Sequence, residues 1–146
     1  MIEHSSLRSA ESLIRFGAEK LSSISNVPRL EAEVLLSNLL KINPIKFHTD
    51  DIGISSNVMD KFESMIESRF KGTPIAYLIG KKEFWSLDFE INPSVLVPRP
   101  ETELLIENAI ELLKDHESPR ILELGTGSGI ISIAVSYTHL TLPTKA

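Results

Sequence analysis

A glycine-rich segment near the carboxyl end limits what this chain can fold into. Arg120–Leu124 is a short apolar run of the kind found in buried strands, and Gly125–Gly129 reads Gly-Thr-Gly-Ser-Gly. Ile130–Val135 then begins an apolar helix. Glycines allow a tight turn and a close approach of the backbone to a ligand, and the following helix start supplies N–H groups at the same place. The segment therefore predicts the first half of a βαβ nucleotide-binding unit.

The spacing of the glycines narrows the ligand class. A dinucleotide fingerprint needs a third glycine where this sequence has Ile130, and no Gly-Lys-Ser/Thr follows as in a phosphate-binding P-loop. Three alternate glycines alone also occur in plain tight turns. Here, however, the acidic Glu123 precedes the loop by one residue. An acidic residue, a spacer and Gly-x-Gly-x-Gly resemble the first motif of S-adenosylmethionine-dependent methyltransferases.

The first 72 residues are predicted to form a small helical bundle. Apolar side chains recur at helical spacing in residues 6–24, from Leu30 to Leu40, and from Met59 to Phe70. Residues 45–55 show no such period and are expected to be irregular. The simplest function of such a bundle is packing or docking rather than chemistry.

After Gly72 the spacing of the apolar residues changes from a helical period to alternation. Glu83–Trp85 and Leu87–Ile91 predict two short strands of a hairpin around Ser86, with Phe84 and Trp85 as core aromatics. Residues 73–97 are thus expected to be a β-hairpin linker. Residues 101–116 predict a helix with inward side chains at Leu104, Leu105, Ala109, Leu112 and Leu113.

Several motifs occur in one order that resembles a known family. They are Gly72–Gly80, Glu83–Trp85, Leu96–Glu103 (Leu-Val-Pro-Arg-Pro-Glu-Thr-Glu) and Leu122–Gly129, with Arg29–Glu33 in the helical part. Together they resemble the peptide-chain release factor glutamine methyltransferases, the HemK/PrmC family. The resemblance runs from about residue 7 to Val135, and the Pro-Arg-Pro-Glu-Thr-Glu segment is its most distinctive part.

The resemblance implies N5-methylation of the glutamine in the Gly-Gly-Gln motif of peptide-chain release factors, with S-adenosylmethionine as cofactor. It implies that residues 1–72 help dock the release factor, the protein substrate. The implied cofactor-binding residues are Gly125, Thr126, Gly127, Ser128 and Gly129, with Glu123 and Arg99 as additional candidates. The resemblance also implies that the Pro-Arg-Pro segment lies close to this pocket. Arg99 has an alternative role, an ion pair with Glu101 or Glu103.

No catalytic residue is assigned, because two features of the family are absent after the loop. No Asp or Glu follows Glu123, so the acid expected ~20 residues later to hold the ribose is missing. The Asn-Pro-Pro-Tyr motif, which in the family aligns the target amide, is also missing. We expect an inactive chain, because an amide nitrogen is a poor nucleophile and its methylation depends on orientation.

The end of the chain is expected to depart from the family. Arg120 to Ala146 spans 27 residues, whereas a complete βαβ unit needs ~30 or more. The segment Ser136–Ala146 carries no helical apolar stripe and is expected to be a non-family tail. The expected fold class is therefore α+β: a helical bundle (1–72), a hairpin linker (73–97), the start of a Rossmann-like methyltransferase domain (98–135), left incomplete, and the tail (136–146).

The composition argues against several classes of partner and ligand. Fifteen Lys and Arg against twenty Asp and Glu give a net charge of −5, which disfavours direct nucleic-acid binding. The chain has no cysteine, its four histidines show no metal-ligand spacing, and no apolar run approaches the ~18 residues of a membrane span. We expect a cytoplasmic monomer without metal.

Two other functions remain open from the residues. The helical part could be a docking module for a translation factor, with no chemistry in the remainder. The glycine loop could belong to a nicotinamide-binding oxidoreductase, although its glycine spacing fits that class poorly. Binding of S-adenosylmethionine, of a release factor or of NADH distinguishes the three.

Overall fold

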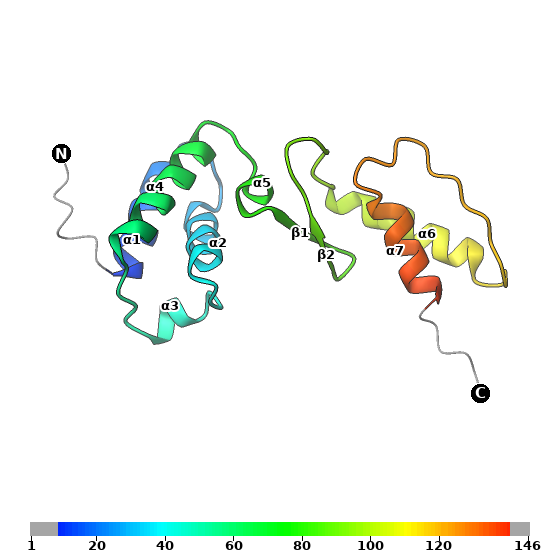
Figure 1. Cartoon of the computed structure of the whole chain (residues 1–146), viewed down its shortest axis with the longest axis horizontal. Coiled ribbons are helices and arrows are strands. Elements are labelled where there is room, and N and C mark those ends of the chain that lie inside the picture. Colours follow the sequence, from blue (N-terminus) through cyan, green and yellow to red (C-terminus); the bar gives the residue numbers. More distant parts are fainter. Residues whose placement is uncertain (1–8, 141–146) are drawn as a thin grey trace. The chain divides into compact units, whose positions relative to one another are not determined.

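The computed structural model describes residues 9–140, with side chains as far as Thr138. The chain divides between Ile79 and Gly80 into two compact units (Figure 1). The first unit consists of helices, whereas the second contains a two-stranded hairpin, a short 3-10 turn and two helices.

Three helices form the body of the first unit: α1 (Ala10–Leu21), α2 (Pro28–Leu40) and α4 (Ser56–Phe70). Each contacts the other two (Figure 1). The helical bundle predicted from the apolar period is thus confirmed for the described residues. Two short helices were not predicted, α3 (Lys46–Thr49) and α5 (Ile75–Ile79). The expectation that residues 45–55 are irregular was wrong at α3, because a single turn is too short to show a 3.6-residue period.

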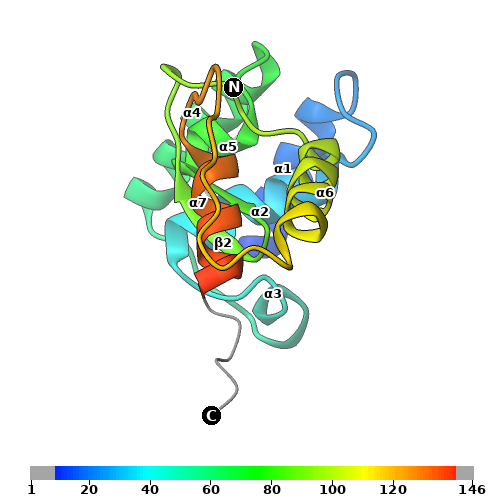
Figure 2. The same ribbon diagram turned by 90° about the vertical axis from the view of Figure 1, so that its right-hand side faces the viewer.

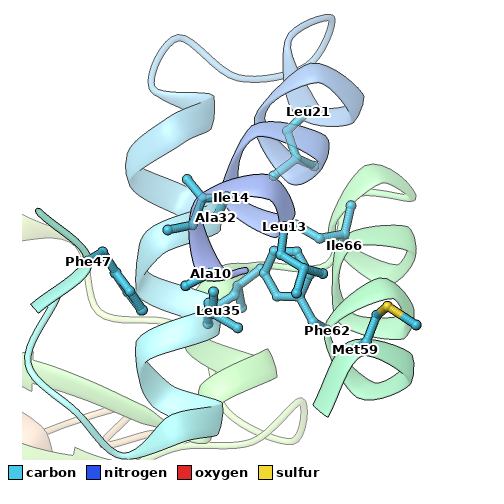
Figure 3. Packing of buried hydrophobic residues seen from close by; sticks show 11 residues of the cluster. Ala10, Leu13, Ile14, Leu21, Ala32, Leu35, Phe47, Met59, Phe62 and Ile66 are labelled. Atoms are coloured by element: carbon cyan, nitrogen blue, oxygen red, sulfur yellow. The ribbon is translucent and has the colours of Figure 1, made fainter. Parts of the chain in front are cut away.

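The core of this unit is apolar and closely packed (Figure 3). Phe62 and Ile66 of α4 are fully buried between side chains of α1 and α2. Gly17 of α1 lies at the closest approach, where an added Cβ would lie 2.9 Å from Ile66 Cδ1 and 3.1 Å from Ala32 Cβ. A glycine at this position lets α1 approach both neighbouring helices. The buried core residues are Ala10, Leu13, Ile14, Leu21, Ala32, Leu35, Leu36, Phe47, Met59, Phe62 and Ile66.

The loop before α4 is tied to the start of α1. Ser9 caps α1 by accepting a hydrogen bond from the Ser12 N–H, at 3.3 Å, through its side chain. The backbone N–H of Ala10 donates to the Ile52 carbonyl at 2.9 Å, and Ser9 forms a bridge with Gly53. These bonds hold the segment at Ile52 and Gly53 against the start of α1.

The second unit begins with the predicted hairpin, formed by β1 (Lys81–Phe84) and β2 (Leu87–Glu90). The strands are antiparallel, with Lys81 opposite Glu90 and Phe84 opposite Leu87. The two-residue turn between them has φ of 53° at Trp85 and 56° at Ser86. Positive φ at both turn residues matches the right-handed twist of the strands. Phe84 is buried as expected, while Trp85 is only partly buried.

A short 3-10 turn, η1 (Pro100–Thr102), leads into α6 (Glu103–Leu113), and α7 (Ile130–Leu140) packs on α6 (Figure 2). The predicted inward face of α6 was wrong at three leucines, whereas Ala109 and Leu113 are partly buried. Leu104, Leu105 and Leu112 are 57%, 57% and 76% exposed, whereas Ile106 is fully buried. Within the described part of this unit α6 packs mainly on one helix, so only a narrow stripe of its apolar surface is covered.

The strand predicted at Arg120–Leu124 does not form in the described residues. The segment has no regular structure, and Leu122 and Leu124 are 84% and 86% exposed. A strand exists only through hydrogen bonds to a neighbouring strand. The sheet formed by the described residues contains β1 and β2 alone, so the segment has no partner there.

The first residues of the segment predicted to be a non-family tail are helical. Helix α7 continues through Ser136 to Leu140, and no proline or glycine interrupts it there. The Thr138 hydroxyl donates to the Ala134 carbonyl at 2.9 Å and accepts from the Trp85 indole N–H at 2.8 Å. Residues 141–146, the rest of the expected tail, lie outside the described residues.

Candidate functional site

The glycine loop has a backbone that only glycines adopt readily. Gly125, Gly127 and Gly129 have φ of 72°, 53° and 72°. These values lie in the left-handed region, where a Cβ clashes with the neighbouring backbone. The loop is closed by a hydrogen bond of 2.7 Å from the Gly129 N–H to the Thr126 carbonyl, and the Gly129 carbonyl accepts from the Ile133 N–H at 2.9 Å. The three alternate glycines are therefore explained by the turn into α7.

Glu123 is fixed at the beginning of α7. Its Oε2 accepts a hydrogen bond of 3.0 Å from the Ser132 backbone N–H and a second one from the Ser132 hydroxyl. Ser132 is the third residue of α7, and its N–H belongs to the group that no carbonyl of the same helix can satisfy. The carboxylate thus caps the helix from nine residues away and brings the 121–124 segment to its amino end.

A cavity of about 380 Å³ lies beside this loop. Six of the seven predicted cofactor residues line it: Arg99, Glu123, Gly125, Thr126, Gly127 and Ser128. Gly129 does not line it and instead directly precedes the first residue of α7. Residues from the Pro-Arg-Pro segment and from the glycine loop, separated by more than 20 positions in sequence, therefore share one cavity.

Sequence reasoning placed the Pro-Arg-Pro segment near the pocket but missed most of the other lining residues, which are largely apolar. The further lining residues are Leu96, Pro98, Thr102, Leu105, Ile130 and Ile131. Leu96, Pro98 and Thr102 belong to the distinctive Leu96–Glu103 segment, so that segment was the available signal. Leu105 was assigned to a helix core, and Ile130 and Ile131 only to a helix start. Apolar walls with a few polar groups are typical of small-molecule sites.

The alternative role of Arg99 finds no support among the ion pairs of the described residues. None of them joins Arg99 to Glu101 or Glu103. The Glu103 carboxylate instead accepts the backbone N–H of Trp85, at 3.0 Å. The Arg99 side chain is therefore left at the cavity rather than in a local salt bridge.

A larger cavity of about 600 Å³ lies at the turn of the hairpin. It is lined by Glu83, Trp85, Ser86, Leu87, Glu103, Tyr137 and Thr138. None of the predicted cofactor residues belongs to it. We assign the candidate site to the smaller cavity, because a glycine loop, a helix start and two opposite charges converge there.

No group of three or more His, Asp or Glu residues among the described residues could hold a metal ion. No helix in residues 9–140 is both long and apolar enough to cross a membrane.

The chain is similar to known proteins along most of its length. Residues 12–80 match the model of the PrmC N-terminal domain. The release factor glutamine methyltransferase of Coxiella burnetii is 42% identical over 128 residues, which are 86% of this chain and 46% of the relative. The protein of that name from Buchnera aphidicola subsp. Schizaphis graminum is 45% identical over 120 residues, which are 81% of this chain and 42% of the relative. The one from Buchnera aphidicola subsp. Baizongia pistaciae is 38% identical over 128 residues, which are 87% of this chain and 46% of the relative.

These relatives place the chain among methyltransferases. More narrowly, it belongs to the family of release factor glutamine methyltransferases. The ordered motifs from Arg29–Glu33 to Leu122–Gly129 predicted this family. The chain spans about half the length of the curated relatives it matches.

Proposed function

We propose that the cavity at the glycine loop binds S-adenosylmethionine, and that this sequence contributes the cofactor loop and the docking unit to methylation of a release factor. The acceptor would be the glutamine of the Gly-Gly-Gln motif. The observation that carries the proposal is the meeting of Arg99, Glu123 and Gly125–Ser128 in one cavity of about 380 Å³. Its size lies within the range of ~300–1,000 Å³ usual for ligand sites.

The lining fits the chemistry of this cofactor. Thr126 and Ser128 offer hydroxyl groups, while Leu96, Leu105 and Ile131 offer apolar surface for an adenosyl group. Arg99 and Glu123 are charges of opposite sign, matching the carboxylate and ammonium of a methionine moiety. The bound cofactor would supply the methyl group.

In the reaction, the side-chain amide nitrogen of the acceptor would receive the methyl group in place of one of its protons, which would be released to solvent. The amide lone pair is delocalised, so the rate depends on holding the nitrogen in line with the methyl group. No residue of this chain is assigned to that step. The helical unit would contribute by docking the release factor.

Calorimetric titration of the chain with S-adenosylmethionine tests the proposal. We expect binding in the micromolar range, weakened about tenfold by Gly127→Ala, because alanine disfavours the positive φ of the loop. Gly53→Ala is the matched control, since a Cβ there would contact no atom within 4 Å and its position is outside the cavity.

Three results would point elsewhere. Heat with NADH alone would favour an oxidoreductase. Binding to a release factor without binding to S-adenosylmethionine would favour a docking module without chemistry. Equal affinities of the wild type and Gly127→Ala would show that the cofactor binds outside the glycine loop.

A further inference from the structure

The larger cavity, at the turn of the hairpin, combines negative charge with aromatic rings. Its volume is about 600 Å³, and it shares no lining residue with the proposed cofactor site. Glu83 and Glu103 carry its charge, while Trp85 and Tyr137 contribute the rings. None of its described lining residues is a lysine or an arginine. The lining therefore favours a cationic ligand, because carboxylates and the faces of aromatic rings both attract cations.

The indole of Trp85 is held in place by the protein itself. The backbone N–H of Trp85 donates to Glu103 Oε1 at 3.0 Å, and the indole N–H donates to the Thr138 hydroxyl at 2.8 Å. Trp85 is nevertheless only partly buried, and Tyr137 is 55% exposed, so a ligand can reach both residues from solvent. A side chain that is already ordered loses little conformational entropy when it binds a ligand.

The two carboxylates of the cavity are not neutralised by a neighbouring cation. Among the ion pairs of the described residues, none includes Glu83 or Glu103. The whole second unit is acidic as well, since from Gly80 onward the sequence has ten Asp and Glu against six Lys and Arg. Most of the net charge of −5 therefore belongs to the unit that contains the cavity. Such a surface is complementary to a basic partner.

We propose that this cavity binds an arginine side chain of the protein substrate. A guanidinium group is planar, so it can stack on an aromatic ring while its N–H groups donate to a carboxylate. A lysine ammonium would match the charge but has no planar face. The inference extends the proposed function by adding a contact with the release factor outside the helical unit, and it rests on that function for the identity of the partner.

Trp85 is the single tryptophan of the chain and lines the cavity, so its fluorescence reports binding there. The probes are three tripeptides with acetylated and amidated ends, Gly-Arg-Gly, Gly-Lys-Gly and Gly-citrulline-Gly, titrated into the full chain. Citrulline has nearly the shape of arginine but no charge. We expect a saturable change of Trp85 emission with the arginine peptide and weaker binding of the lysine peptide. The citrulline peptide should bind about tenfold more weakly than the arginine peptide.

Two variants remove the charges of the cavity one at a time. Glu83→Gln and Glu103→Gln keep the size of the side chain, and the glutamine carbonyl at position 103 can still accept the Trp85 N–H. Glu83→Gln should weaken the arginine peptide about threefold, because Glu83 is exposed. Glu103→Gln should weaken it about tenfold, because Glu103 is partly buried. Glu107→Gln on α6 is the matched control, exposed and outside the lining, and should leave the affinity unchanged.

The same variants titrated with a release factor separate this inference from the proposed function. Weaker binding of the release factor to Glu83→Gln than to Glu107→Gln supports the contact. No response of Trp85 to the arginine peptide, or equal affinities for the arginine and citrulline peptides, overturns the inference. The proposed function stands in that case if the chain still binds S-adenosylmethionine and the release factor.

Two further results count against parts of the proposal. A lysine peptide that binds as tightly as the arginine peptide contradicts the assignment to arginine. A chain that binds the arginine peptide but no release factor contradicts the docking part of the proposed function, and with it the identity of the partner.

Discussion

Arg69 of α4 and Glu31 of α2 form a two-point ion pair in which the guanidinium Nε and one terminal nitrogen each donate, at 2.9 Å, to a different carboxylate oxygen. The two side chains are only 19% and 15% exposed. The paired geometry and partial burial make such an interaction stronger than an ordinary surface ion pair. The pair joins the end of α4 to the first half of α2, 38 residues away in sequence.

Arg69→Gln should therefore destabilise the helical unit by about 1–2 kcal/mol, because Glu31 loses both charged donors. Urea unfolding followed by far-UV circular dichroism measures this. Lys20→Gln serves as the control, since Lys20 pairs with Glu67 at 3.3 Å with both side chains over 40% exposed. Its cost should be below about 0.5 kcal/mol. Equal costs for the two variants would show that Arg69 contributes no more than a surface charge.

Gly17→Ala should destabilise the same unit by about 1–3 kcal/mol, although alanine favours helix by about 1 kcal/mol. The added Cβ would approach Phe62 Cζ to 3.0 Å and Ile66 Cδ1 to 2.9 Å. Ile66→Val removes that Cδ1 and should recover part of the loss in the double variant. Gly53→Ala, with no atom near the new Cβ, should change the unfolding midpoint little. A more stable Gly17→Ala protein would mean that the helices separate at little cost.

Arg29 makes the helical unit sensitive to acid. Its guanidinium donates to both Glu11 oxygens, at 3.0 and 2.9 Å, and this hydrogen bonding lowers the pKa of the Glu11 carboxyl. A carboxyl whose pKa is lower in the folded state contributes stability above its unfolded pKa, and the contribution is lost as pH falls through the folded value. The window therefore lies below about pH 4.5.

Arg29→Gln should accordingly lower the free energy of unfolding at pH 7 by about 1–2 kcal/mol, because it removes the donors of the exposed Glu11 and also of Glu33, whose side chain is only 10% exposed. The difference from the wild type should narrow as pH falls from 5 to 3. Lys61→Gln changes the charge equally at an exposed site of α4 and should give a small difference that stays constant. A gap that widens in acid would contradict the assignment.

Ser86→Gly should stabilise the hairpin unit by about 0.5–1 kcal/mol, since glycine adopts the φ of 56° at this turn without a Cβ clash. Thermal unfolding followed by Trp85 fluorescence measures the effect, because Trp85 is the single tryptophan of the chain and lies in the same turn. Ser94→Gly, at an exposed position outside the left-handed region, should be neutral or slightly destabilising. A lower melting temperature for Ser86→Gly would show that the serine side chain is needed in the turn.

Much of the architecture follows from local sequence pattern. The apolar periods of α1, α2 and α4 and the alternation in β1 and β2 each arise within one element and depend on few distant contacts. The turn at Trp85 and Ser86 carries no glycine or asparagine, yet its position follows from the alternation on either side. Local patterns of this kind also led to the glycine loop.

The errors share a physical cause. Leu104 and Leu112 were expected to face a core, and Arg120–Leu124 was expected to be a strand, but both expectations depend on a partner that local sequence does not specify. An apolar stripe is buried only where another element covers it, and a strand needs a neighbour to complete its hydrogen bonds. In the described residues Leu112 and Leu122 are exposed instead.

The sequence alone determined that a glycine loop joins an acidic residue to a helix, and that the surrounding motifs resemble one methyltransferase family. Only the tertiary structure showed that Arg99 reaches the cavity of that loop, and that Glu123 is bound to Ser132 at the helix end. The reason is that backbone conformation and helical period are encoded by adjacent residues, whereas convergence of side chains from distant segments depends on how those segments pack.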